Sequence, residues 1–258
     1  MSQPEPDREA LDALVAEFRA ASGYDGEVDH FAFADTPEVQ TELAQLVLAG
    51  PKRATAGLHD DPDGDAPTEV GQHDAVLDGD GAPVCIIRTD EVRALPFRER
   101  DPAFAWDEGE GDRTLADWTD IHERYFERYL TEAGGTFGED TLVSFQRISV
   151  VWPEVDAAPP LVADGEVVVR PVGPDGRAWV RTVTGEVTSD DGWTTDRCPA
   201  LLARQAGRSA GVLVFVPSPE RTEVVATSLL EESEGVEAAL RTALADLREI
   251  YGWGAIDA

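Results

Sequence analysis

The 258-residue chain carries 52 acidic and 21 basic residues, a formal net charge of −31, and 42% of its residues are hydrophobic. That hydrophobic content supports a packed core and excludes wholesale disorder, while the charge argues against affinity that depends on many phosphate contacts. Only one basic residue, Lys52, is a lysine, and the rest are arginines. Acidic residues spread along the whole chain, with almost no lysine, are typical of proteins from a cytosol at molar salt, where the charges of carboxylates are strongly screened.

The first half of the chain alternates between helical and strand patterns. Apolar residues at i, i+3, i+4 and i+7 predict a helix over 7–21, and Pro37 and Gly50 bound a second helix over 37–49. A turn then leads into a short strand over 50–58. Further along we expect strands at 74–77, 83–89 and 141–151, a short helix and acidic turn over 101–112, and a helix starting at Thr114.

Residues 153–165 hold three prolines and few large apolar residues, which predicts a linker. Beyond it, strands are expected at 166–172, 211–216 and 222–229, with helices near 175–184 and 234–249. The sequence therefore predicts a first domain over 1–152 and a small α/β domain over 166–258.

Cys85 and Cys198 lie far apart and form no CxxC motif, so we expect neither a cysteine zinc site nor any other bound metal or cofactor. No apolar run approaches 18 residues and no signal peptide is evident. We therefore expect a soluble cytoplasmic protein without a membrane partner.

The single lysine is the first candidate for chemistry. Arginine serves as well for surface charge, but only lysine supplies a compact amine that can lose its proton. Lys52 is therefore a candidate base or nucleophile, and Thr55, three residues later, supplies a hydroxyl that a neighbouring amine can activate. The alternative is that Lys52 survives by chance on a surface turn.

A second candidate is the run Glu108-Gly109-Glu110-Gly111-Asp112, in which single glycines separate three carboxylates. Such a turn either directs one acid into a cleft or is a solvated acidic turn. On the following helix, Trp118 and His122 share one face. Trp118 can stack on a base or pack in the core, and helical spacing favours the core. His122 either takes part in the site or is a hydrogen-bonded histidine of the core or the cleft edge.

Three segments carry a family resemblance: GPKRAT (50–55), VLDGDGAPVCIIRTDEVRALPF (76–97) and AWDEGEGDRTLADWTDIHERYF (105–126). Together, in this order, they resemble the ASCH domain family. The resemblance implies an α+β fold, a PUA-like β-barrel with helices at its rim, and an association with RNA. It also leaves homo-oligomers open.

Small ASCH amidohydrolases remove acetyl from N4-acetylcytidine with a motif lysine, a motif threonine and a downstream glutamate. The resemblance places these roles on Lys52, Thr55 and Glu108, with Glu110 as a rival glutamate. Another member has been described as a ribonuclease, and a non-catalytic module that binds RNA or a nucleotide is the third alternative. The substrate contacts expected at this site are Arg53, Glu110, Asp112, Trp118 and His122.

The C-terminal segments 167–183, 211–216 and 222–247 together resemble a reduced GNAT acetyltransferase. In that family a glycine-rich turn at a helix N-terminus holds the pyrophosphate of acetyl-CoA. Here the turn over 232–237 retains one glycine and is acidic, so we expect no acetyl-CoA binding and no catalysis from this half. A pairing or docking role is the alternative.

Overall fold

The structure is a computed structural model that describes residues 3–61, 67–154, 161–164, 167–230 and 235–257. It is a mixed α/β protein with two separate sheets, and the chain divides into two compact units. The N-terminal unit comprises Met1–Arg98, Glu108–Glu110 and Phe126–Ala158, and the C-terminal unit comprises Glu99–Asp107, Gly111–Tyr125 and Pro159–Ala258. The sequence predicts one division at 153–165, whereas these units assign most of 99–125 to the C-terminal one.

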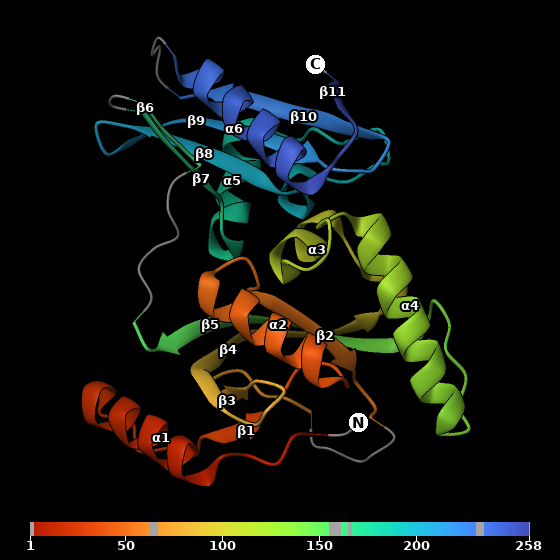
Figure 1. The fold of residues 1–258 in the computed structure, drawn as a ribbon. Coiled ribbons are helices and arrows are strands. Elements are labelled where there is room, and N and C mark those ends of the chain that lie inside the picture. Colours follow the sequence, from red (N-terminus) through yellow and green to blue (C-terminus); the bar gives the residue numbers. More distant parts are fainter. Residues whose placement is uncertain (1–2, 62–66, 155–160, 165–166, 231–234, 258) are drawn as a thin grey trace. The chain divides into compact units, whose positions relative to one another are not determined.

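The N-terminal unit is built on a five-stranded sheet with the strand order β1-β3-β4-β5-β2. Helix α1 packs on one face of the sheet through Leu11 and Phe18, and α2 packs on the other through Leu43 and Val47. Both helices are visible in Figure 1. The elements are α1 (Arg8–Ser22), β1 (Asp29–Phe31), α2 (Pro37–Ala49), β2 (Ala54–Leu58), β3 (His73–Leu77), β4 (Pro83–Pro96) and β5 (Leu142–Trp152).

Local signals in the sequence account for both helices, and the predictions are confirmed. The Asp7 side chain accepts a hydrogen bond from Ala10 N at the start of α1. Pro37 opens α2, and Gly50, with φ at 116°, ends it in the left-handed region that only glycine adopts freely.

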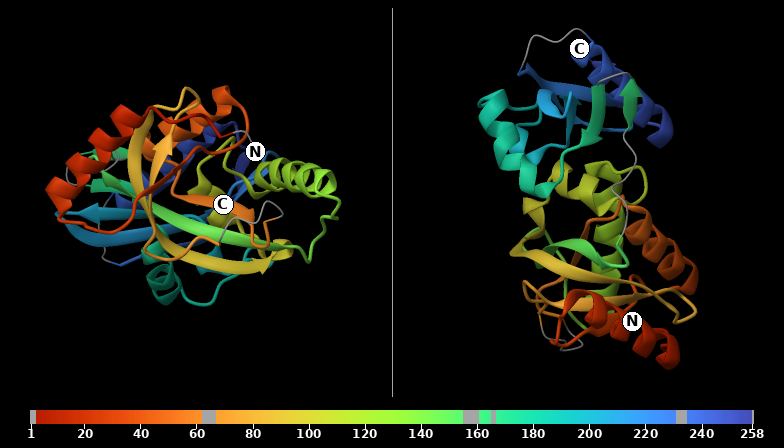
Figure 2. Two further views of the ribbon diagram at one scale, coloured as in Figure 1. Left: turned by 90° about the horizontal axis from the view of Figure 1, so that it is seen from below. Right: turned by 90° about the vertical axis from the view of Figure 1, so that its left-hand side faces the viewer.

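Strand β4 is longer than predicted and reaches Pro96 because β5 pairs with it over almost its whole length. Register shifts at Ile86/Ile87 and Thr89/Glu91 mark bulges, and the strand follows a curved course (Figure 2). The predicted barrel is not confirmed. Within the described residues, edge strands β1 and β2 each pair with a single neighbour, so this sheet stays open.

The C-terminal unit has a six-stranded sheet with the order β11-β10-β9-β8-β7-β6, antiparallel except for the β10–β11 pair. Helix α6 packs on one face, and α5 packs on the other. Its strands are β6 (Val162–Asp164), β7 (Val167–Pro171), β8 (Ala200–Gln205), β9 (Arg208–Val216), β10 (Arg221–Leu229) and β11 (Ala255–Asp257). The helices are α3 (Pro102–Glu108), α4 (Leu115–Glu132), α5 (Arg177–Thr184) and α6 (Val236–Tyr251), of which α3 ends in, and α4 continues into, the N-terminal unit.

The predicted strands at 166–172, 211–216 and 222–229 and the two predicted helices are confirmed, whereas β6, β8 and β11 were not predicted. Strand β8 was missed because its sequence, ALLARQ, consists of residues that favour helices. Strand β6 lies inside the predicted linker, of which 155–160 and 165 fall outside the described residues.

Trp106 of α3 belongs to the core of the C-terminal unit. It is 2% exposed, and its ring lies 5.4 Å from that of Phe215 and 5.8 Å from that of Trp253. The Arg113 guanidinium lies 3.4 Å from the Trp106 ring centroid and donates two hydrogen bonds to the Trp106 carbonyl. No local pattern in the sequence indicates that a tryptophan so far along the chain from this sheet completes its core.

A buried ion pair lies in the same unit. The Arg177 guanidinium of α5 pairs with the Asp107 carboxylate of α3 and donates a second hydrogen bond, of 2.9 Å, to Cys198 O. Both charged side chains are nearly fully buried. Among the helices in the described ranges, none is both long and apolar enough to cross a membrane.

Candidate functional site

Lys52 lies between the end of α2 and the start of β2. Its backbone N–H bonds to Leu46 O, which ties the lysine to the last turn of the helix. The side chain is 1% exposed, although lysine is rarely buried without a partner. Its Nζ donates to Glu110 Oε1, lies 3.7 Å from Glu108 Oε1, and sits 4.9 Å from the centroid of the Phe33 ring.

The end of α3 and the turn that follows it supply the two carboxylates, Glu108 and Glu110. Gly109 has φ at +72°, and a Cβ on it would lie 2.3 Å from Pro51 O. Only glycine can therefore pass this close to the Lys52 backbone, and it leaves Glu108 and Glu110 on either side of the turn. The Glu108 side chain is 2% exposed and that of Glu110 is 23% exposed. The structure thus brings to Lys52 both glutamates between which the sequence could not choose.

The charges of this cluster determine what it can do. One ammonium faces two carboxylates, so the three groups carry one negative charge in excess. Attraction between such groups is strong where water is excluded. The cluster can accept one further proton without becoming a buried net cation.

Thr55 is the second residue of β2, which is an edge strand. It lies opposite Gln146 of β5 and is half-buried. Three residues of extended chain span at most roughly 10 Å, so Thr55 and Lys52 stay close to one end of the strand. The contacts described for Lys52 go to Glu110, Glu108 and Phe33, and none of them goes to Thr55.

Arg53, which is expected to contact substrate, forms hydrogen bonds with backbone carbonyl groups. Its guanidinium donates hydrogen bonds of 2.7 Å to Val47 O, in the last turn of α2, and to Lys52 O. Burial lowers the pKa of Arg53, an effect that the Cys85 thiol opposes. These bonds favour a structural role, in which Arg53 holds the segment around Lys52 against the helix.

The family model for the ASCH domain matches residues 29–152. The protein EF3133 from Enterococcus faecalis V583 is 30% identical over 55% of this chain and 88% of its own, with a TM-score of 0.51. This chain belongs to the ASCH domain family. The ASCH domain from Lactobacillus crispatus JV V101 is 29% identical over 56% of this chain and 95% of its own, with a TM-score of 0.52.

Membership of the ASCH family suggests an RNA-associated function. A weaker likeness covers a smaller share of the chain. A ribosomal-protein-alanine N-acetyltransferase from Brucella melitensis biovar Abortus 2308 is 17% identical over 36% of this chain and 78% of its own, with a TM-score of 0.28. The comparison with curated proteins gave no match. The GNAT-like interpretation stays a prediction, and residues 232–234 of its acidic turn lie outside the described residues.

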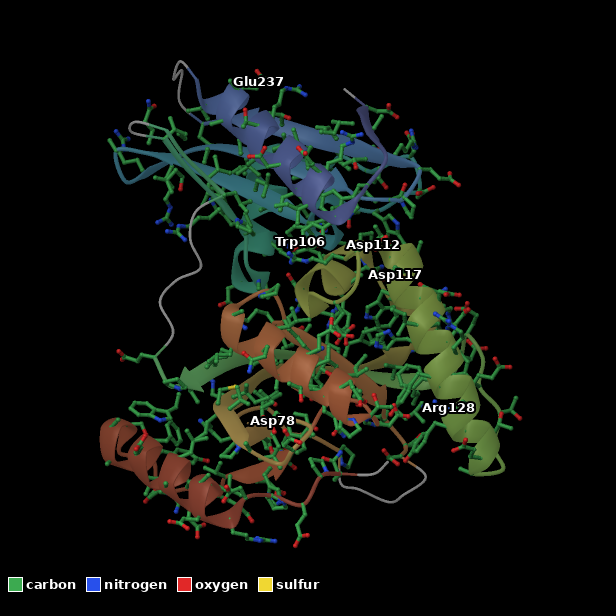
Figure 3. The ribbon with its side chains drawn as sticks, viewed as in Figure 1. Asp78, Trp106, Asp112, Asp117, Arg128 and Glu237 are labelled. Carbon is green, nitrogen blue, oxygen red and sulfur yellow. The ribbon has the colours of Figure 1, made fainter. Side chains whose placement is uncertain are left out.

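The other substrate contacts expected of this ASCH protein lie in the C-terminal unit, and the geometry favours structural roles for them. Asp112 Oδ1 accepts a 2.8 Å hydrogen bond from Thr114 N, and its backbone N–H bonds to Asp117 Oδ2 at the start of α4 (Figure 3). The rings of Trp118 and His122 stack 4.0 Å apart, and His122 Nδ1 lies 2.9 Å from Trp118 O. Both rings are buried, which supports core packing rather than base stacking.

Sequence reasoning missed three polar residues near Thr55. Gln146 lies across from it, Ser144 is buried, and Ser144 Oγ lies 3.1 Å from His59 Nδ1. Their shared face follows from the pairing of β2 with β5, which the sequence does not reveal. Within the described ranges, no group of three or more His, Cys, Asp or Glu side chains is arranged to hold a metal ion.

Proposed function

We propose that this ASCH protein is a hydrolase that removes an acyl group from the amide of a modified nucleoside such as N4-acetylcytidine. The observation that carries the proposal is the buried Lys52, held by Glu108 and Glu110 just before the strand that bears Thr55. A buried lysine with two carboxylates is expensive to maintain for stability alone, because desolvation offsets much of the attraction. Strongly coupled charges of this kind gather at catalytic sites.

In the first half of the reaction, Thr55 Oγ forms a bond with the carbonyl carbon of the amide. The hydroxyl proton passes to the cluster, with Lys52 as the relay and a glutamate as the final acceptor. The carbon–nitrogen bond then breaks, and the cluster returns this proton to the departing amine. The products of this half are the free nucleoside and an ester on Thr55.

In the second half, water attacks the ester carbonyl and gives its proton to the same cluster. The carbon–oxygen bond to Thr55 breaks, Thr55 regains a proton, and the carboxylic acid leaves. The sum is one amide and one water converted into one amine and one carboxylic acid. The excess negative charge of the cluster supplies the single proton-accepting position that each half requires.

The charge of the chain supports a small neutral substrate over a polymer. With 52 acidic and 21 basic residues, the protein repels a string of phosphates, and salt weakens phosphate contacts further. An uncharged nucleoside is not repelled by the negative charge of the protein, and its binding does not depend on phosphate contacts. Cleavage of RNA and binding of RNA without turnover are therefore the second and third outcomes of the test.

The test is mass-spectrometric detection of cytidine released from N4-acetylcytidine in about 2 M KCl, where surface charge is screened. Wild type is compared with Lys52→Arg, Thr55→Ala and the control Thr227→Ala, which removes an exposed threonine hydroxyl from β10. We expect turnover by wild type and by the control. Lys52→Arg and Thr55→Ala should each lose more than about a hundredfold, because guanidinium cannot relay the proton and alanine cannot attack.

If the Lys52→Arg and Thr55→Ala variants stay as active as wild type, the proposed site is wrong. If wild type itself has no activity, the acyl-hydrolase proposal is wrong, and a single-stranded RNA is tested next for cleavage and then for binding. In a protein that only binds RNA, Lys52→Arg should be nearly harmless, since arginine keeps the positive charge.

A further inference from the structure

The face of the sheet around Thr55 carries a polar strip, of which the reaction above uses only Thr55. Side chains alternate along a strand, so Thr55, Gly57 and His59 point to one face of β2. Their neighbours on β5 are Gln146, opposite Thr55, and Ser144, opposite Gly57. Pairing continues past the strand, because His59 N donates to Leu142 O. The five residues therefore form one patch, which we call the strip.

The strip lies on the face that α2 also covers. Gln146 and Ile148 are two residues apart on β5 and share a face, and Ile148 packs in the core cluster that includes Val47 of α2. The apolar core ends there, and Gln146 and Thr55 beyond it are only half-buried. The strip therefore lies at the edge of the apolar core, where this face of the sheet becomes polar and partly exposed.

Gly57 leaves room in the middle of this strip. It does not adopt a positive φ, so the backbone does not require glycine here. A Cβ built on it meets no atom within 4 Å outside its own chain neighbours. Thr55 and His59, on either side of Gly57 along the strand, bear side chains. The surface above Gly57 is therefore a gap between them, which we call the floor.

The groups around this floor suit the edge of a heterocyclic base. The Gln146 carboxamide both donates and accepts, so it can pair with an adjacent acceptor and donor on a planar ring. Ser144 Oγ and His59 Nδ1 already lie 3.1 Å apart, which orients both for a further contact. Gly57 lies about 7 Å along the strand from Thr55, so a ring above it can hold its exocyclic amide near the hydroxyl.

We propose that the strip is the base subsite, in which the pyrimidine ring of the substrate nucleoside lies over Gly57 and its polar edge pairs with Gln146. The inference rests on the proposed function and adds the groups that select the substrate. It predicts that filling the floor over Gly57 blocks the ring without disturbing the fold, because valine is well tolerated in a strand.

The experiment compares wild type with Gly57→Val, Gln146→Met and the control Gly138→Val. Gly138 likewise lacks a positive φ and has no atom within 4 Å of an added Cβ apart from its chain neighbours, but it lies in the turn before β5. We measure kcat and KM on N4-acetylcytidine, cytidine binding by calorimetry, and the urea midpoint of each protein. Loss of a bidentate pair by Gln146→Met should raise KM by roughly 10- to 100-fold.

Gly57→Val should raise KM at least as much and weaken cytidine binding to the same extent, while its urea midpoint stays at that of wild type. Gly138→Val should match wild type in every measurement. If Gly57→Val retains the wild-type KM and cytidine affinity, the base does not lie over Gly57 and the inference is overturned.

Cytidine binding separates this inference from the proposed function. A wild type that binds cytidine but does not cleave N4-acetylcytidine would contradict the hydrolase while leaving the subsite to be judged by the binding of the variants. A wild type that binds no cytidine overturns the subsite, whatever its activity.

Discussion

The ion pair between Arg177 and Asp107 offers the sharpest test of how the C-terminal unit is held together. Both side chains are about 5% exposed, so neither charge reaches bulk water. Replacing Arg177 with methionine keeps much of the side-chain volume but leaves the Asp107 carboxylate buried without this cation. Removing one partner of a buried pair costs about 3–5 kcal/mol, so the free energy of unfolding should fall by that amount.

The matched control is Arg241→Met on α6, whose partner Glu237 lies 3.0 Å away and is about half exposed. An exposed pair contributes about 0–1 kcal/mol, so this variant should barely change stability. The double variant Arg177→Met/Asp107→Leu should recover most of the loss, since apolar replacements of a buried pair are often neutral.

The assay is urea unfolding followed by tryptophan fluorescence at several KCl concentrations. Five of the six tryptophans belong to the C-terminal unit, so the signal reports mainly on it. With a slope of about 2–3 kcal/mol/M, Arg177→Met should lower the urea midpoint by roughly 1–2.5 M. The loss should not change with salt, because buried charges are poorly screened. A loss below about 1 kcal/mol, or one that fades with KCl like that of the control, would refute the reasoning.

Three further predictions concern charge and burial. Burial raises the pKa of Asp74, an effect that the hydrogen bond from Gln72 opposes. The free energy of unfolding should therefore fall as pH rises from about 3.9 through the raised pKa. Urea midpoints should show that Asp74→Asn stabilises the fold at pH 7 but not below pH ~3.9. Burial raises the pKa of Cys85 and Cys198 to about 12, so at pH 8 a thiol reagent should label neither in the native protein and both in urea; labelling of the native protein would contradict their burial. Because the net charge is −31, raising KCl from 0.1 to 2 M should increase the urea midpoint, and an unchanged midpoint would mean that charge repulsion does not limit stability.

Local chemistry made much of the fold predictable. The apolar spacing of α1 and the boundary residues Pro37 and Gly50 of α2 act within a few turns of the chain, and they mark both helices correctly. Strand β8 and the closure of the barrel could not be judged this way. Closure of a sheet depends on pairing between distant segments, whereas β8 pairs with its chain neighbour β9 but consists of residues that favour helices.

The candidate site shows the same division. Lys52 was identifiable because the composition leaves only one lysine, and the glycines marked the turn that carries Glu108 and Glu110. The bonds of Arg53 to backbone carbonyls could not be foreseen, because the sequence does not display such contacts. Gln146 was missed because its position opposite Thr55 depends on the register of β2 with β5.

The route of the chain has a practical consequence. Between residues 98 and 126 it changes compact unit four times, so the stretch that matches the ASCH family is not confined to one unit. A fragment that ends after β5 would expose Trp106 to water, and a fragment that begins at β6 would lack that ring from its core. No single cut therefore yields two intact pieces. We therefore expect that expression of a folded protein requires both halves in one chain.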